Sequence, residues 1–240
     1  MTIAVVPTYN EIENLPQLIA RIRALPFPIH ILVVDDASPD GTGQLADQLA
    51  RVDPLLTVLH REGRRGRGLA GREGFLHALE LGAERIVEMD ADLSHRPEHI
   101  PALLQALAEC DLSLGSRAVP GGRDCDRGRP RQWLTRLANG FTRRVLAIPV
   151  RDCNSGFRAF RRQALITIKP ATLRSRGPAI VHEVLYRAQR AGLRIKEVPI
   201  QFVDRRVGQS TLTFRTLAAS YFAVLRLRAL DFSSQPSQRS

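Results

Sequence analysis

Short apolar runs alternate with amphipathic stretches through the first half of the chain, and this alternation constrains the fold more than any other feature. Residues 3–6 and 31–34 are apolar at consecutive positions, as in strands that are covered on both faces. Between such runs, apolar residues recur at helical spacing. The order of strand and helix predicts an α/β domain with a mostly parallel sheet flanked by helices.

The pattern sets the expected elements. We expect strands over residues 2–7, 29–35, 56–60, 85–89 and 111–115, and helices over residues 13–25, 42–51, 71–81 and 97–108. In the second half we expect a mobile basic loop over 120–130, a helix over 133–148, a strand over 156–160, a helix over 182–191, a strand over 195–203 and a last helix over 214–230. The 240 residues suit a single domain over residues 1–215, followed by an amphipathic helix and a disordered tail over residues 216–240.

The net charge of +11 indicates anionic partners, and nearly all of the positive charge is arginine because Lys169 and Lys196 are the only lysines. Phosphates, an acidic membrane surface and nucleic acid all suit a guanidinium-rich surface. Aromatic residues make up only 5% of the chain, which argues against the stacking platforms of a nucleic-acid-binding protein. The three cysteines form no CxxC pair, so we expect neither a disulfide framework nor a thiolate metal site.

We expect no signal peptide and no transmembrane helix. The first residues lack a basic segment before the apolar run. The longest apolar candidate, residues 217–230, falls short of the roughly 20 residues that span a bilayer and contains Arg226 and Arg228. The helix expected over 133–148 has an arginine-rich face, as in helices that lie at a lipid interface. These features predict a peripheral protein on the cytoplasmic side of a membrane.

Two acidic pairs follow expected strands. Asp90 and Asp92 come directly after the strand at 85–89, where the carboxyl ends of parallel strands bind ligands and two carboxylates can hold Mg²⁺ or Mn²⁺ with substrate phosphates. The alternative is a solvated turn before the helix at Pro97. Asp35 and Asp36 end the strand at 29–35 and could bind a base or ribose, although ordinary turn chemistry is the favoured explanation when this pair is taken alone.

A glycine-rich segment and six histidines give weaker signals. The glycines at 63, 66, 68 and 71 resemble a phosphate cradle but match neither a dinucleotide-binding motif nor a P-loop, so a solvated linker remains open. The histidines show no paired metal-ligand spacing. His182 lies at the start of an expected helix, where a purely structural role explains it.

Taken together, the motifs resemble the family 2 glycosyltransferases of the GT-A fold, which is Rossmann-like, and among them the dolichol or polyprenol phosphate mannosyltransferase group. The matching segments, in family order, are VVPTYNE (5–11), VVDDASPDGT (33–42), MDADLSHRPEHIP (89–101), GSRAVPGG (115–122), SGFRAFRR (155–162) and EVPIQFVDRRVGQSTL (197–212), with Glu183 between the last two. The resemblance implies transfer of mannose from GDP-mannose to a dolichyl or polyprenyl phosphate with inversion. It also implies Mg²⁺ or Mn²⁺ as cofactor, contact with a membrane surface and a possible membrane-anchoring partner subunit.

The resemblance implies the site residues as well. The nucleotide sugar would be held by Pro7, Tyr9, Glu11, Val34, Asp35, Asp36, Asp90, Ala91 and Asp92, the cation by Asp90, Asp92 and Ser94, the diphosphate by Arg117 and Arg205, and the acceptor phosphate by Arg131 and Thr135. Of these, Asp92, Arg117, Arg131 and Arg205 are expected to act in catalysis. A phosphate monoester has a second pKa of about 6, so it needs no dedicated general base.

The sequence departs from the family pattern at three positions. Thr211 replaces a lysine, Asn154 replaces the threonine of DxTSGFR, and Arg67 replaces the apolar residue of the GLGxA segment. Three alternatives therefore remain open at this point. They are an enzyme that transfers glucose or another sugar from a UDP-sugar to undecaprenyl phosphate, a catalytically silent homologue, and a basic nucleic-acid-binding protein.

Overall fold

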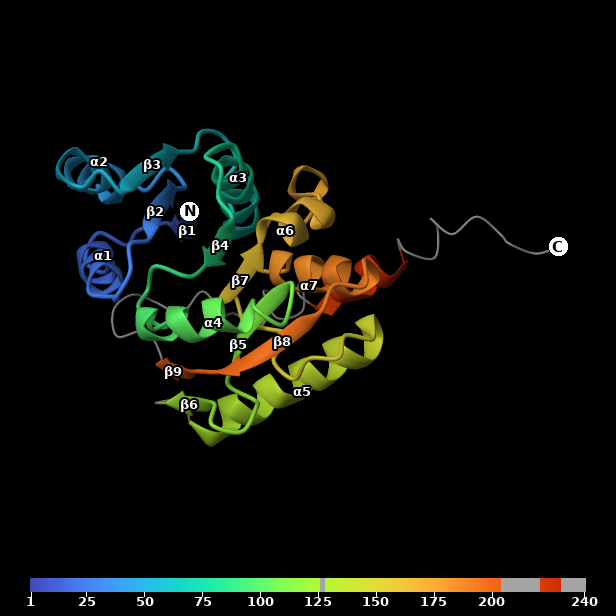
Figure 1. Cartoon of the computed structure of the whole chain (residues 1–240). Helices are drawn as coiled ribbons and strands as arrows, with labels where there is room; N and C mark the ends of the chain where they lie inside the picture. The colour runs from blue at the N-terminus through green and yellow to red at the C-terminus, as the bar shows by residue number, and fades with distance from the viewer. Residues whose placement is uncertain (126–127, 204–220, 230–240) are drawn as a thin grey trace.

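The computed structural model describes residues 1–125, 128–203 and 221–229 (Figure 1). Its strands are β1 (Thr2–Thr8), β2 (His30–Asp35), β3 (Leu56–His60), β4 (Arg85–Glu88), β5 (Leu112–Ser116), β6 (Arg123–Cys125), β7 (Arg158–Arg161), β8 (Ile195–Pro199) and β9 (Gln201–Val203). Its α-helices are α1 (Leu15–Arg23), α2 (Thr42–Val52), α3 (Arg67–Glu80), α4 (Ile100–Ala106), α5 (Arg129–Leu146), α6 (Arg162–Ile168) and α7 (Ile180–Arg190). Two 3₁₀ turns are η1 (Pro97–His99) and η2 (Pro170–Thr172), and residues 221–229 are helical.

The main sheet has seven strands in the order β3-β2-β1-β4-β7-β5-β8. Strands β3, β2, β1 and β4 are mutually parallel, β7 is antiparallel to both of its neighbours, and β5 is parallel to β8. The predicted mostly parallel α/β sheet is therefore confirmed.

Both faces of the sheet are buried, which explains the continuous apolar runs. Because side chains alternate along a strand, Ile3 and Val5 of β1 join a core cluster with α3, α6 and α7. Ala4 and Val6 point the other way and join a second cluster with α1, α2 and α4. The result is a sheet between two helical layers (Figure 1).

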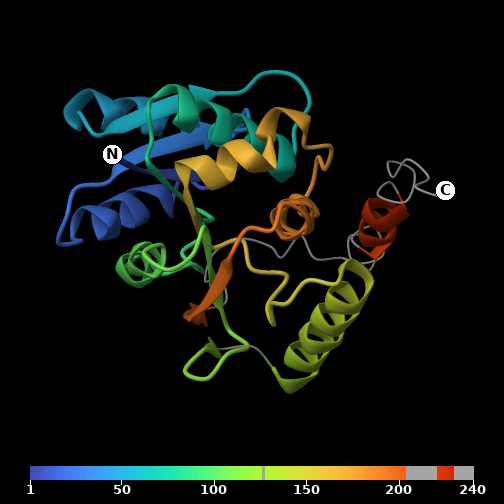
Figure 2. The same ribbon diagram turned by 45° about the vertical axis from the view of Figure 1, so that its right-hand side comes forward.

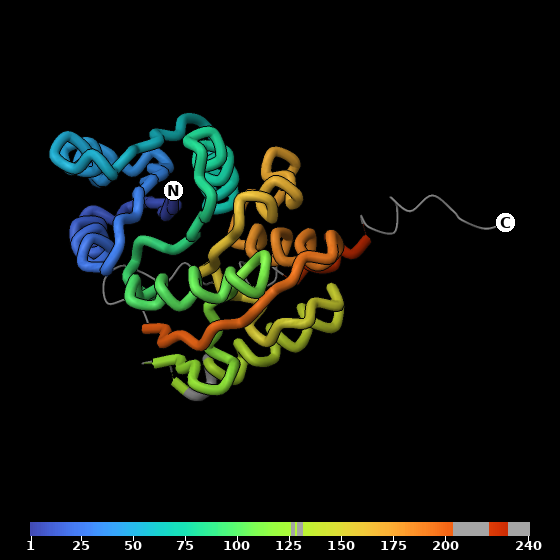
Figure 3. The backbone as a smooth tube through the Cα atoms, viewed as in Figure 1, coloured from blue at the N-terminus to red at the C-terminus, as the bar shows by residue number. Residues whose placement is uncertain are grey.

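The strand order reverses at β1, whose two neighbours are β2 and β4. The chain runs from β1 through α1 to β2 and β3, and then returns through α3 to β4 on the other side of β1. After β4 it crosses to the start of α4 (Figure 3). In open α/β sheets, ligands bind outside the carboxyl ends of the strands at such a reversal.

Most element predictions are confirmed, and five are corrected. Helices α3 and α5 begin at Arg67 and Arg129 rather than at residues 71 and 133, and α6 was not predicted. The predicted loop at 120–130 contains β6, and the single strand predicted over 195–203 is two strands in two sheets. Both of the latter errors have one cause, because β6 and β9 pair with each other across a long sequence separation.

Helix α5 lies at the outer edge of the molecule, away from the helical layers (Figure 2). Its carboxyl-terminal half packs against residues 221–229. There the rings of Phe141 and Tyr221 meet edge to face, with their centroids 5.0 Å apart. Trp133, Leu134 and Leu137, nearer its start, are exposed. None of the helices within the described ranges combines the length and the apolar character that crossing a membrane requires.

Candidate active site

The parallel register brings the two acidic pairs to one edge of the sheet. Thr8 of β1 lies opposite Asp35 of β2, and Val5 lies opposite Glu88 of β4. The residues that follow these strands, Asp36 and Asp90 among them, therefore leave the sheet on the same side. This is the edge at which the strand order reverses, and it is the candidate site.

Asp92 is held in a tight turn. The hydroxyl and the amide of Ser94 donate hydrogen bonds to Oδ1 of Asp92 at 2.5 and 3.1 Å. Leu93 between them adopts a left-handed conformation with φ 61°. Both acceptor and donor are nearly buried, and Asp92 lines a pocket of about 310 Å³ together with Asn14, Gln17, Arg21, Leu93, Arg96 and Val203. The turn fixes the carboxylate before any ligand arrives.

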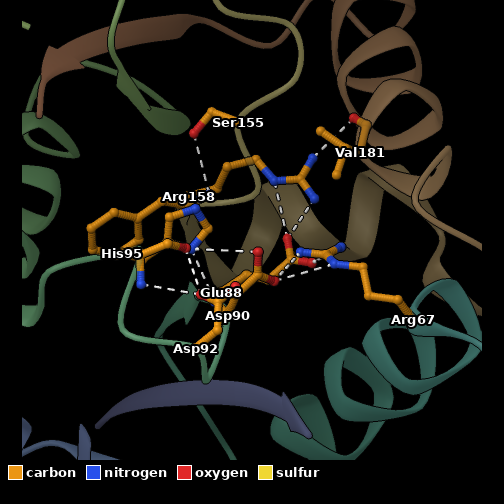
Figure 4. Close-up of polar contacts among 10 residues, drawn as sticks. Arg67, Glu88, Asp90, Asp92, His95, Ser155, Arg158 and Val181 are labelled. Carbon is orange, nitrogen blue, oxygen red and sulfur yellow. Dashed lines mark hydrogen bonds and ion pairs between the residues drawn. The ribbon is translucent and has the colours of Figure 1, made fainter. Parts of the chain in front are cut away.

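Asp90 is held by two neighbours (Figure 4). Its Oδ1 accepts hydrogen bonds from Nη2 and Nε of Arg67 at 2.9 and 3.3 Å. Its backbone amide donates to Nδ1 of His95 at 3.0 Å. His95 is buried and stacks on Phe157, and burial lowers its pKa, so the ring is neutral with its proton on Nε2. A neutral acceptor at this position orients the Asp90 backbone without adding charge.

A buried ionic pair lies under Asp90. Glu88 and Arg158 are both fully buried, and Oε2 of Glu88 accepts from Nε and Nη2 of Arg158 at 3.0 and 2.5 Å. The other carboxylate oxygen accepts from Nη1 of Arg67 at 3.0 Å. Arg67 thus bridges Glu88 and Asp90, as Figure 4 shows. Burial lowers the pKa of Arg67, but the two carboxylates more than offset this and raise it, so Arg67 is charged.

Asp35 lines a second pocket at the same edge. Its carboxylate accepts hydrogen bonds from the hydroxyl and amide of Ser38 at 2.5 and 3.2 Å. The pocket measures about 310 Å³ and is lined by Asp35, Ala37, Ser38, Gly43, Gln44, Asp47, His60 and Arg61. A methyl group on Gly43 would lie 2.8 Å from Oδ2 of Asp35, so the glycine leaves this carboxylate room.

Asp36 forms an ion pair and a hydrogen bond with nearby residues and does not line the pocket beside Asp35. It pairs with the buried Arg61 and accepts a hydrogen bond from the amide of Gly66 at 2.6 Å. Arg61 in turn contacts Glu73 of α3 at 2.8 Å. Asp36 therefore anchors the segment that leads from β3 into α3.

At its carboxyl-terminal end the glycine-rich segment packs closely against the backbone of residues 175–177 and is not a solvated linker. A methyl group on Gly66 would lie 2.4 Å from the carbonyl oxygen of Arg176, and one on Gly68 would lie 2.3 Å from that of Ser175. The carboxylate of Glu183 holds the opposing strip by accepting from the amides of Arg174 and Ser175. The two glycines serve close packing at the start of α3.

The other residues predicted to bind the nucleotide sugar differ in whether their side chains are accessible. Tyr9 is exposed, and its hydroxyl accepts from Arg65 at 3.0 Å. The side chains of Val34 and Ala91 are buried in the core, so only their main-chain atoms can meet a ligand. Pro7 lies within β1 opposite Val34, and Glu11 accepts a hydrogen bond from Asn14 at 2.7 Å.

Arg117 is engaged by Asp152. Its Nε and Nη2 donate to the two carboxylate oxygens at 2.7 and 2.8 Å, and the guanidinium lies 4.7 Å from the ring centre of Phe202. Amide hydrogen bonds continue from Asp152 through Asn139 and Asn154 to the buried His182. Burial, and then Arg158, lower the pKa of His182 to about 4, which supports the structural interpretation.

The structure describes the predicted acceptor-phosphate residues only in part. Thr135 is half-buried on α5. Arg131 belongs to the same helix, but its side chain lies outside the described residues, as do Arg205 and Thr211.

Arg67, Glu88 and Arg158 were not among the predicted site residues. Glu88 ends β4 after the apolar Ile86 and Val87, and Arg158 begins β7 before the apolar Ala159 and Phe160. Opposite charges at buried positions of neighbouring strands could have identified the Glu88–Arg158 pair. In the sequence, Arg67 was notable only as a departure from a family pattern. Its hydrogen-bond partners could be identified only from the structure.

The carboxylate oxygens at this edge of the sheet suit a hard divalent cation that also binds a phosphate group. Within the described part of the chain, no three His, Cys, Asp or Glu side chains gather into a metal-binding group. Mg²⁺ commonly takes one or two protein carboxylates and completes its shell with water and substrate phosphates. Asp92, with Asp90 beside it, meets that requirement.

Comparison with known proteins extends this picture. The sequence model for glycosyl transferase family 2 matches residues 3–169. An undecaprenyl-phosphate mannosyltransferase from Micrococcus luteus is 42% identical over 211 residues, which cover 88% of this chain and 87% of that protein. A polyprenol monophosphomannose synthase from Mycolicibacterium smegmatis is 41% identical over 225 residues, which cover 93% and 85%.

Solved structures share the fold at lower identity. Glucosyl-3-phosphoglycerate synthase from Mycobacterium tuberculosis, in complex with Mn²⁺, UDP-glucose and phosphoglyceric acid, superposes with a TM-score of 0.69 at 20% identity, covering 99% of this chain and 81% of that one. A mannosyltransferase from Pyrobaculum calidifontis, in complex with GDP-Man and Mn²⁺, gives a TM-score of 0.58 at 19% identity, covering 100% and 76%. The GT-A fold that the sequence motifs imply is confirmed.

Proposed function

The chain belongs to glycosyl transferase family 2, and from that premise we propose that it transfers a mannosyl group from GDP-mannose to a polyprenyl phosphate with inversion at the anomeric carbon. The observation that carries the proposal is the near full-length match to two polyprenyl-phosphate mannosyltransferases at 42% and 41% identity. The geometry of the sheet edge supports it, because carboxylates and arginines meet there as a nucleoside diphosphate sugar requires.

For the donor, we propose that the nucleoside binds along the pocket beside Asp35, with Pro7, Tyr9, Glu11 and the main chain of Val34 as its other contacts. Asp35 is fixed by Ser38 and can accept hydrogen bonds from ribose hydroxyls. Asp36 contributes indirectly, by holding Gly66 and Arg61 in place.

For the diphosphate, we propose a divalent cation held by Asp92 with Asp90 and Ser94, at the main-chain turn that includes Ala91. Such a cation neutralises the charge that develops on the departing diphosphate. Arg117 and Arg205 would add positive charge nearby, and the pair with Asp152 holds Arg117 in a fixed orientation. Both Mg²⁺ and Mn²⁺ suit oxygen donors of this kind.

For the acceptor, we propose that Arg131 and Thr135 on α5 receive the lipid phosphate. A phosphate monoester with a second pKa of about 6 is largely dianionic at neutral pH, so its oxygen attacks without a protein base. The task of the protein is to bring this anion in line behind the anomeric carbon, which arginine can do through charge and a planar set of donors.

The exposed side of α5 supports contact with a membrane surface. Trp133 is 63% exposed and Phe222, on the helix at 221–229, is 70% exposed, with Leu134, Leu137 and Leu225 also exposed. Arg136, Arg143, Arg144 and Arg226 are exposed on the same two helices. Apolar and cationic side chains together are typical of helices that lie on anionic lipid. We propose that the protein binds the cytoplasmic side of the membrane through these helices, with or without an anchoring partner subunit.

The test is transfer of labelled sugar in detergent to a short polyprenyl phosphate, from GDP-mannose and separately from UDP-glucose, with Mn²⁺ or Mg²⁺ and with a chelator. We expect a chelator-sensitive mannolipid from GDP-mannose only. Product from UDP-glucose alone would overturn the proposed donor, and product from neither donor would contradict catalysis by the isolated chain.

A further inference from the structure

A buried carboxylate connects α5 with the arginine that we propose lies beside the donor diphosphate. Asp152 is fully buried. Its side chain accepts hydrogen bonds from Nε, Nη2 and the backbone amide of Arg117 at 2.7, 2.8 and 3.1 Å. From α5, Nδ2 of Asn139 donates to Oδ1 of Asp152 at 3.4 Å, and this is the oxygen that Nη2 of Arg117 also contacts. One carboxylate therefore contacts both α5 and Arg117.

Asp152 is itself fixed to the sheet. Glu197 of β8 accepts hydrogen bonds from the backbone amides of Arg151 and Asp152 at 2.8 and 3.1 Å. Arg117 follows directly after β5, the strand that pairs with β8. Burial alone would raise the pKa of Asp152, but Arg117 more than offsets this and lowers it, so the carboxylate is charged. Asp152 is thus a charged acceptor at a defined place, against which α5 can be aligned.

The charge of Asp152 also sets the direction of the hydrogen bonds beyond it. A carboxylate can only accept, so Asn139 offers it an N–H and turns its carbonyl oxygen away. That oxygen accepts from Nδ2 of Asn154 at 2.6 Å. Oδ1 of Asn154 then lies 3.0 Å from Nε2 of His182, which carries the proton. Within the described part of the chain, Nδ1 of His182 is buried without a hydrogen-bond partner, as suits the nitrogen without a proton. All of these bonds are mutually consistent.

We propose that Asn139 is a positioning residue, which joins α5 to Asp152 and so holds the acceptor-binding helix at a fixed distance from Arg117. Thr135, which we propose contacts the acceptor phosphate, lies one helical turn before Asn139 on α5. The inference rests on the proposed function, because Arg117 and Thr135 have their roles from it. It assigns to Asn139 no contact with either substrate.

The kinetic consequence follows from the geometry of an in-line displacement. The acceptor oxygen, the anomeric carbon and the departing diphosphate have to be aligned, and a small displacement lowers the rate of reaction much more than it weakens binding. A residue that sets the position of α5 relative to Arg117 therefore affects kcat. A residue that contacts the acceptor in the bound state as well, as we propose for Arg131, affects the KM for the lipid.

The experiment compares Asn139→Ala with Asn154→Ala in the full chain. The two substitutions remove the same atoms from neighbouring members of one hydrogen-bond chain. In the described structure Asn139 donates to Asp152, whereas Asn154 donates to Asn139, so the second variant keeps the contact under test. Melting curves verify that both variants are folded.

The first measurement is independent of transfer. It is the exchange with water of the Nε–H of Arg117, followed by nuclear magnetic resonance of ¹⁵N-labelled protein, with the signal identified by its loss in Arg117→Lys. We expect exchange at least about fivefold faster in Asn139→Ala, because the carboxylate loses the donor that holds it from α5, and a change below about twofold in Asn154→Ala. Unchanged exchange in Asn139→Ala, or an equal increase in both variants, would overturn the proposal. An Nε–H too labile to detect in the unaltered protein would also overturn it.

The second measurement is steady-state transfer from GDP-mannose to a short polyprenyl phosphate in detergent. We expect kcat to fall by about tenfold in Asn139→Ala, with both KM values within about threefold of the unaltered protein, and kcat of Asn154→Ala to stay within about threefold. A higher KM for the lipid with unchanged kcat would make Asn139 an acceptor ligand and overturn the proposal. Absence of transfer by the unaltered protein would contradict the proposed function instead, and the exchange of the Arg117 Nε–H would still decide whether Asn139 positions Arg117.

Discussion

The two sides of the molecule that would meet the two substrates are built differently. At the sheet edge, Asp90, Asp92 and Asp35 are each held by hydrogen bonds from neighbours that are themselves buried or fixed. On the outer side, α5 and residues 221–229 expose apolar side chains and arginines. The difference indicates that the proposed donor site is preorganised, whereas the proposed acceptor side is a surface of the kind that binds lipid.

The largest effect expected on the donor side comes from Asp92→Ala. Loss of the carboxylate that we propose binds the cation should reduce mannosyl transfer by roughly 10³-fold, because the diphosphate would leave without charge neutralisation. The measurement is the initial rate of transfer with saturating Mn²⁺, together with the melting temperature. Wild-type turnover in a folded Asp92→Ala protein would contradict the cation site.

The second largest effect is expected from breaking the buried ion pair between Glu88 and Arg158 beneath the site. Arg158→Met leaves Glu88 buried beside Arg67 alone, and breaking a buried ion pair costs about 3 to 5 kcal/mol of unfolding free energy. Urea unfolding measures this loss, and Arg194→Met is a suitable control because the Arg194 side chain, which pairs with Asp111, is largely exposed. A loss below 1 kcal/mol for Arg158→Met would mean that the donor side is less rigid than its contacts indicate.

On the acceptor side, Arg131→Ala should raise KM for the polyprenyl phosphate by roughly tenfold, because a charge-assisted hydrogen bond contributes about 1.5 to 3 kcal/mol. The KM for GDP-mannose should change by less than about twofold. Steady-state kinetics with each substrate varied in turn provides both values. An equal rise in the two KM values would remove Arg131 from the acceptor side and break the comparison.

His182 lies where the hydrogen-bond chain from α5 meets α7, and it gives a pH-dependent prediction. Its pKa is about 4 when folded and about 6.5 when unfolded, so the unfolded state takes up more protons between these values and stability falls as pH decreases from 6.5 toward 4. Between pH 6.5 and 5.5 the loss should be about 1 kcal/mol. Urea unfolding of His182→Gln should lack this component. An identical pH profile in both proteins would contradict the assignment of a buried neutral imidazole.

The smallest effect is expected at the surface that we propose contacts lipid. Trp133→Ala should weaken binding to vesicles that contain anionic phosphatidylglycerol by about threefold, because one of several apolar contacts is lost. Flotation of the protein with vesicles measures it, with Val52→Ala as a control for loss of an exposed apolar side chain elsewhere. Equal effects of the two substitutions would argue against α5 as the membrane contact.

The sequence supported prediction of the sheet and of its acidic edge, because consecutive apolar residues and strand-end carboxylates are local signals. It could not reveal the network around Arg67, since Glu88, Asp90 and Gly156 approach that side chain only after β4 and the segment before β7 come together. Nor could it show that Asp36, which neighbours Asp35 in the sequence, forms an ion pair with Arg61. The pairing of β6 with β9 escaped prediction for the same reason, because both strands are short and far apart in the chain.

The most direct test of the account is the stereochemistry of the product. The anomeric configuration of the mannosyl phosphate made from GDP-mannose and a polyprenyl phosphate can be assigned from the one-bond carbon–hydrogen coupling in nuclear magnetic resonance. Direct attack by the ionised acceptor phosphate predicts inversion and hence a β-linked mannosyl phosphate. An α-linked product would require a covalent or otherwise retaining route, and would contradict the single in-line displacement by a preorganised donor site.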